Sequence, residues 1–197
     1  MGTYITREEF DSFYQHVPER VLIILDEAYF EFSQSTSDYP DSMTYRYNNV
    51  ITLRTFSKAY GLAGARIGYG FAHEELIGNL LKVKVPFEPS YLAQVAGYAA
   101  LDDIPFLSKT IEINEAGMNY MKKEMEKLNI QYVPAITNFI TTVWGSDEKA
   151  TNITKQLLEK GVIVRHLTPF GWNNCIRVSI GLKEENQRFI AAISEIL

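Results

Sequence analysis

The sequence predicts an α/β protein in which residues 1–104 form a parallel-rich sheet with helices and residues 105–197 form a small α+β domain. Two observations lead to this prediction. In the first part, short apolar runs alternate with helical segments, which is typical of a parallel, doubly wound sheet. Near Pro105 the pattern changes to a long amphipathic segment followed by shorter strands and helices. We therefore place the domain boundary near residue 104.

The composition indicates a folded protein, because 46% of the residues are hydrophobic and only 22% are charged. A net charge of −5 at pH 7, without any lysine- or arginine-rich run, argues against a nucleic-acid partner. No stretch approaches the roughly 18 consecutive apolar residues of a membrane helix, so we expect a cytoplasmic protein without a membrane partner. Cys175 is the only cysteine, which excludes an intrachain disulfide and a cysteine-built metal site.

The first part begins with a capping box, Thr6-Arg-Glu-Glu9, which predicts a helix that starts at Arg7 and ends before Pro18. Two apolar runs and the segment after a glycine-rich turn are expected to be strands, and two amphipathic segments follow as helices. The expected strands are 21–25, 50–55 and 67–72, and the expected helices are 74–84 and 90–102.

The second part opens with an amphipathic segment at about 107–128, which predicts one helix that bridges two parts of the molecule. Alternating apolar runs and helical patterns follow it, as expected for a small α+β domain. The expected strands are 139–144, 162–165 and 176–180, and the expected helices are 147–160 and a terminal helix from Glu184.

The chemically richest stretch follows the second strand and contains Thr55, Ser57 and Lys58. Lys58 should emerge at the carboxyl end of that strand, where open α/β sheets bind their ligands. The two hydroxyls and the nearby Arg66 can bind an anion. A lysine beside an anion site indicates a Schiff-base lysine next to a cofactor phosphate. The alternative is a polar strand-to-helix loop with one solvent-exposed lysine.

Asp26 directly follows the first strand, so it and Lys58 are expected at the same edge of the sheet. Pyridoxal phosphate needs an amine for its aldehyde, a carboxylate for its ring nitrogen, and donors for its phenolic oxygen and its phosphate. Lys58, Asp26 and Tyr29 provide the first three groups. The phosphate donors are Thr55, Ser57 and Arg66.

The segments Asp26-Glu-Ala-Tyr29 and 55–70 resemble the second half of fold-type I, class I/II pyridoxal-phosphate aminotransferases, most closely the histidinol-phosphate aminotransferases. The resemblance extends from Gly2 to Leu197. It implies a catalytic Lys58 that carries the internal aldimine of pyridoxal 5'-phosphate. Asp26 would bind the pyridine nitrogen and Tyr29 the phenolic oxygen. The residues expected to bind the cofactor phosphate are Thr55, Ser57 and Arg66.

The resemblance also implies a homodimer that transfers an amino group between an anionic amine, such as histidinol phosphate, and a 2-oxo acid, such as 2-oxoglutarate. Arg177 lies in an apolar strand run, where a buried guanidinium needs an anionic partner. It resembles the arginine that binds the substrate's anionic group, although a structural ion pair would also satisfy it. Arg165 resembles a second arginine that contacts substrate phosphate, and its alternative is an ordinary surface residue. Asn138 resembles the family's small-domain asparagine.

Gly2-Thr3-Tyr4 resembles the end of the family's Asn-Pro-x-x-Pro-Thr-Gly segment, so the chain is expected to be a fragment that lacks about half of the active site. We therefore expect weak cofactor binding and little or no transamination from it. An aromatic or other class I/II amino acid aminotransferase, and a catalytically inactive assembly or regulatory fragment, stay open as alternatives. A dinucleotide-binding module is disfavoured, because Gly68-Tyr-Gly70-Phe-Ala-His73 lacks the third glycine of its fingerprint.

Overall fold

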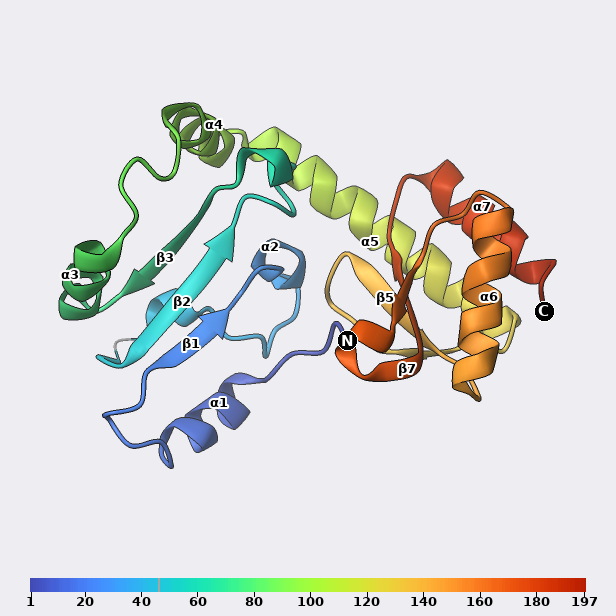
Figure 1. Ribbon diagram of the computed structural model, residues 1–197, viewed down its shortest axis with the longest axis horizontal. Helices are drawn as coiled ribbons and strands as arrows, with labels where there is room; N and C mark the ends of the chain where they lie inside the picture. The colour runs from blue at the N-terminus through green and yellow to red at the C-terminus, as the bar shows by residue number, and fades with distance from the viewer. Residues whose placement is uncertain (46) are drawn as a thin grey trace. The chain divides into compact units, whose positions relative to one another are not determined.

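The computed structural model describes residues 1–45 and 47–197, which form two compact units. The first unit is Tyr4–Thr110, and the second unit combines Met1–Thr3 with Ile111–Leu197. Helix α5 (Ile104–Lys127) begins at the predicted boundary near residue 104 and continues past Thr110, where the first unit ends (Figure 1). In the described part of the chain, no helix is both long and apolar enough to cross a membrane.

The first unit contains a three-stranded sheet in the order β1-β2-β3. Strands β1 (Ile23–Asp26) and β2 (Val50–Thr55) are parallel, whereas β3 (Gly68–Ala72) runs antiparallel to β2 (Figure 1). The third strand therefore departs from the parallel pattern that the sequence predicted. The direction of β3 follows from the connection at 56–67. A parallel crossover would need a helix there, and the connection contains only a short 3-10 turn (Ala63–Ala65).

Helix α1 (Arg7–Tyr14) begins with the predicted capping box. The Thr6 hydroxyl accepts a hydrogen bond from the Glu9 amide at 3.2 Å, and the Glu9 carboxylate accepts one from the Thr6 amide at 2.7 Å. Phe10 on this helix is buried against the sheet with Ile23 and Val50. The other helices of the first unit are α2 (Phe30–Ser33), α3 (Glu74–Val83) and α4 (Tyr91–Asp102).

The second unit contains a four-stranded antiparallel sheet in the order β4-β5-β7-β6. The strand expected at 162–165 begins only at Arg165, where pairing with Arg177 of β7 starts, and Val162 and Val164 precede it and pack against the hydrophobic core. The short strand β4 was not predicted. The elements are β4 (Gln131–Val133), β5 (Phe139–Val143), α6 (Asp147–Glu159), β6 (Arg165–Leu167), β7 (Trp172–Ser179) and α7 (Lys183–Ser194).

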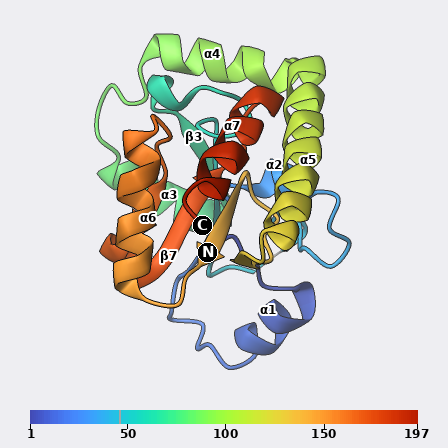
Figure 2. The same cartoon turned by 90° about the vertical axis from the view of Figure 1, so that its right-hand side faces the viewer.

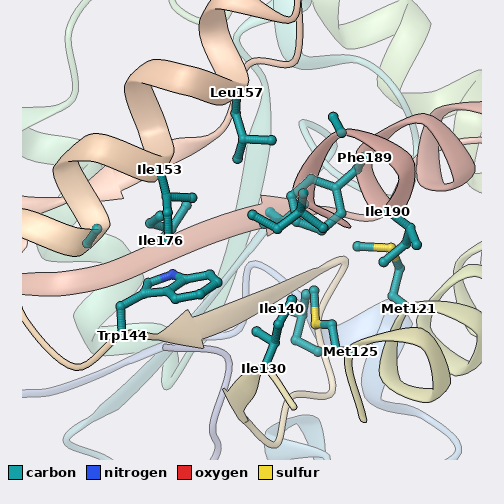
Figure 3. Packing of buried hydrophobic residues seen from close by; sticks show 14 of the residues in the cluster. Met121, Met125, Ile130, Ile140, Trp144, Ile153, Leu157, Ile176, Phe189 and Ile190 are labelled. Atoms are coloured by element: carbon teal, nitrogen blue, oxygen red, sulfur yellow. The ribbon is translucent and has the colours of Figure 1, made fainter. Parts of the chain in front are cut away.

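Helices α5, α6 and α7 cover one face of this sheet, as two views of the unit show (Figures 1 and 2). Ile140 of β5 and Ile176 of β7 face these helices and pack with Met121, Leu157 and Phe189 (Figure 3). Because side chains alternate along a strand, the residues next to these two isoleucines lie on the opposite face of the sheet. That face carries Phe139, Thr141 and Arg177.

Candidate active site

The parallel pairing of β1 and β2 brings the predicted lysine site together at one edge of the first unit's sheet. Asp26 ends β1 opposite Leu53, and Thr55 ends β2 two residues later. Lys58 follows in the next turn, with its Nζ atom 5.4 Å from the centroid of the Tyr29 ring. The structure therefore places a carboxylate, a phenol and an amine at the same sheet edge.

The predicted phosphate donors Thr55 and Ser57 lie at the end of β2, and Arg66 returns to this edge because β3 pairs with β2. Thr55 lies opposite Gly68, so Arg66 precedes the strand that starts beside Thr55. The Ser57 amide donates to the Thr55 hydroxyl at 3.0 Å, which holds a tight turn before Lys58. Arg66 has a left-handed backbone with φ of 53°, and its Nη1 atom donates to the Ala63 carbonyl at 2.8 Å.

The second unit carries two of the predicted substrate residues, Arg165 and Arg177, on the sheet face opposite the three helices. Arg165 of β6 lies directly opposite Arg177 of β7, so the two side chains share this face. The Arg177 guanidinium lies 4.9 Å from the Phe139 ring centroid. The backbone carbonyl of Asn138 accepts a hydrogen bond from Ile180 at 2.8 Å, which positions this residue just before β5.

Neither arginine forms an ion pair within residues 1–45 and 47–197. Like charges directly opposite each other destabilise a sheet. The structural ion pair that was the alternative for Arg177 is thus not formed with any described carboxylate. Arg165 and Arg177 together form a concentrated positive charge that an anion can neutralise.

The sequence pattern of the family described as "Aminotransferase class I and II" matches residues 1–193 of this chain. The chain belongs to this family. Among the similar proteins, histidinol-phosphate aminotransferase 2 of Carboxydothermus hydrogenoformans is 40% identical to this chain, over all of the chain and 54% of that protein. It is 44% identical to the histidinol-phosphate aminotransferase of Moorella thermoacetica, over all of the chain and 51% of that protein.

A solved structure is also similar to this class I and II aminotransferase chain. The histidinol-phosphate aminotransferase from Sinorhizobium meliloti, in complex with pyridoxal-5'-phosphate, superposes with a TM-score of 0.89 at 32% identity. The match covers all of the chain and 54% of that structure. The chain thus spans about half the length of the curated relatives it matches.

The structure also contains an ion pair beside the lysine site that the sequence analysis did not predict. Arg54 donates from Nε and Nη2 to the same carboxylate oxygen of Glu27, at 2.9 and 2.8 Å. Its Nη2 atom also donates to Asp41 at 2.9 Å. The signal in the sequence was an arginine inside an apolar strand run, the same signal that drew attention to Arg177.

A second acid, Glu31, is buried near this ion pair. Its Oε2 atom has no hydrogen-bond partner in the part of the chain that the structure describes. Burial raises the pKa of Glu31, although its backbone hydrogen bond and the charge of Arg54 oppose that shift. Burial likewise raises the pKa of Tyr60, which follows the lysine turn, to about 12, so this phenol keeps its proton at neutral pH.

Proposed function

We propose that this chain binds pyridoxal 5'-phosphate at Lys58 and takes part in transferring an amino group between histidinol phosphate and a 2-oxo acid such as 2-oxoglutarate. Membership of the aminotransferase family and the names of the relatives support this proposal. The main structural support for an anionic substrate is the pair of directly opposed arginines, Arg165 and Arg177, which form no ion pair with a described carboxylate.

The residues at the lysine edge fit the cofactor chemically. Lys58 and Asp26 are both exposed, so a ligand can reach the amine and the carboxylate. The Asp26 Oδ1 atom accepts a hydrogen bond from the Ala28 amide at 3.1 Å, which fixes the orientation of the carboxylate. When bound, pyridoxal phosphate supplies an electron sink for the bond that breaks at the substrate's α-carbon.

The residues at the lysine edge have separate roles in this proposal. Lys58 would hold the cofactor aldehyde, and its amine would move a proton to or from the substrate's α-carbon. Asp26 would keep a proton on the ring nitrogen, and Tyr29 would donate to the phenolic oxygen. The residues that would bind the cofactor phosphate are Thr55, Ser57 and Arg66.

The arginine pair accounts for the choice of substrate. A phosphate group carries close to two negative charges near pH 7, and each guanidinium can bind it through two N–H groups. Phe139 beneath Arg177 and Phe170 near Arg165 restrain the two guanidinium groups, at 4.9 and 5.9 Å from the ring centroids. Asn138, beside Phe139 at the start of β5, is the third proposed substrate contact. The proposal also includes a homodimer, which the family resemblance implied, and a cytoplasmic location, which was expected because the sequence has no long apolar run.

The cofactor part of the proposal is tested by mixing the chain with pyridoxal phosphate, reducing with borohydride and mapping the adduct by mass spectrometry. We expect one dominant adduct at Lys58 that disappears in Lys58→Ala. Lys155→Ala, which removes an exposed lysine of the second unit, is the matched control and should keep the adduct. Labelling that is scattered over many lysines and unchanged in Lys58→Ala would contradict the proposal.

The substrate part is tested by calorimetric titration with histidinol phosphate and with histidinol. Removing one arginine of the pair by Arg165→Met should weaken histidinol phosphate binding by about tenfold or more, because a charge-assisted hydrogen bond contributes about 1.5–3 kcal/mol. Binding of histidinol should change little. Arg188→Met, an exposed arginine whose Nη2 atom donates to the Lys160 carbonyl, is the control. Equal affinity for the two ligands in the wild-type chain would favour an amino acid aminotransferase or an inactive fragment.

A further inference from the structure

We propose that Arg54 is a positioning residue: its buried ion pair with Glu27 fixes the Asp26–Tyr29 turn against the Thr55–Lys58 turn. This inference rests on the proposed function, because these two turns carry the groups that would bind the two ends of the cofactor. The two charged residues are sequence neighbours of the site, since Glu27 directly follows Asp26 and Arg54 directly precedes Thr55.

The ion pair is buried and well ordered by several contacts. The Arg54 and Glu27 side chains are only 5% and 6% exposed. The guanidinium donates twice to Glu27 and once to Asp41, whose side chain is 46% exposed. The aromatic rings of Phe30 and Phe71 lie 3.3 and 5.2 Å from the guanidinium carbon, which restrains the plane of the group.

The pair acts on the site through the backbone. Side chains alternate along β2, so Arg54 lies on one face of the sheet and Leu53 on the other. Asp26 is opposite Leu53 in the parallel register, so its carboxylate belongs to the face away from Arg54. The Glu27 amide also donates to the Leu53 carbonyl at 2.9 Å. Arg54 can therefore hold the two turns together without touching a ligand on the Asp26 face.

A buried ion pair is a poor device for stability alone. Desolvation of the two charges offsets much of their attraction, and apolar residues of similar volume often serve equally well or better. The pair does supply directional bonds that apolar residues lack. We infer that these bonds set the geometry of the two turns.

The test compares wild-type protein with the double variant Glu27→Met/Arg54→Met in backbone hydrogen exchange of the cofactor-free chain. The amides of Ala28 and Ser57 report directly on the two turns, because each donates to a side-chain oxygen within its own turn. We expect both amides to exchange at least tenfold faster in the double variant. The paired strands of the second unit should exchange at unchanged rates, and the melting temperature should stay the same or rise.

Unchanged exchange at Ala28 and Ser57 in the folded double variant would overturn the proposal. Faster exchange spread over both units would overturn it too, because that result indicates a general loss of stability. Glu27→Gln keeps the shape of the side chain and one accepting oxygen but removes the charge, so it serves as the second variant and should speed exchange at both amides by less than the double variant does. Asp41→Asn removes only the charge of the more exposed partner and should have a smaller effect.

Borohydride labelling of the same variants separates this inference from the proposed function. If wild-type protein forms the Lys58 adduct, the affinity for pyridoxal phosphate should fall by about tenfold in the double variant, and an unchanged affinity would overturn the positioning role. If wild-type protein forms no adduct, the proposed function fails. The exchange of Ala28 and Ser57 still decides whether Arg54 orders the two turns.

Discussion

Replacing Leu157 by alanine should lower the free energy of unfolding by about 2–5 kcal/mol, the range for a buried leucine that leaves a cavity. Leu157 lies on α6, is 1% exposed and packs in the core of the second unit (Figure 3). Its neighbour Leu158 is 59% exposed, so Leu158→Ala should change stability by no more than about 0.5 kcal/mol. The pair therefore compares the same substitution at a buried and an exposed position of one helix.

Urea unfolding followed by tryptophan fluorescence measures this difference. Both tryptophans, Trp144 and Trp172, belong to the second unit, so the signal reports on the unit that contains Leu157. Circular dichroism of each variant before unfolding checks that the helices are intact. Equal losses in the two variants would show that α6 does not bury the face that the structure assigns to it.

Gly117→Ala should destabilise the protein by about 1–2 kcal/mol, although alanine favours a helix over glycine by about 1 kcal/mol. A Cβ atom on Gly117 would lie 2.5 Å from Ile180 Cγ2 and 2.8 Å from Asn186 Nδ2. Asn186 cannot move away easily, because its amide group bonds both the carbonyl and the amide of Gly181, at 2.9 and 3.0 Å. The close approach of α5 to this turn thus requires a residue without a side chain.

Gly78 on α3 is the matched control, because a Cβ atom there would meet no atom within 4 Å. Gly78→Ala should therefore stabilise the protein by about 0.5–1 kcal/mol through helix propensity alone. Thermal unfolding followed by circular dichroism checks both variants. A stabilising Gly117→Ala would mean that α5 lies further from Ile180 than the structure places it.

The elements with strong local signals could be predicted from the sequence. The capping box at Thr6 and Glu9 marks the start of α1, and the apolar run of β2 gives its bounds at Val50–Thr55. Lys58 was expected at the carboxyl end of that strand, and the parallel register of β1 and β2 places it there with Asp26. The bounds of α1 and β2 depend on residues close together in sequence, whereas the meeting of Asp26 and Lys58 follows from the rule that parallel strands end at one edge of their sheet.

The features that the sequence did not reveal depend on contacts between distant segments. The direction of β3 follows from the connection after Lys58, which contains no crossover helix. The start of β6 depends on where it pairs with β7, a strand later in the chain. The ion pair of Arg54 with Glu27 joins residues 27 positions apart, so the arginine in its apolar run indicates that a partner is needed but not which residue provides it. The roles assigned to Lys58 and its neighbours stay predictions until the labelling experiment is done.

Strand β1 lies at the edge of its sheet, where it pairs only with β2 among the described residues. Its Ile24 side chain is 60% exposed. An unpaired strand edge with apolar side chains recruits strands from other molecules. Such association stabilises the folded state by mass action, so unfolding midpoints should rise with protein concentration. Dilute samples will therefore give the stability of the single chain, and a concentration series will reveal how strongly this edge associates.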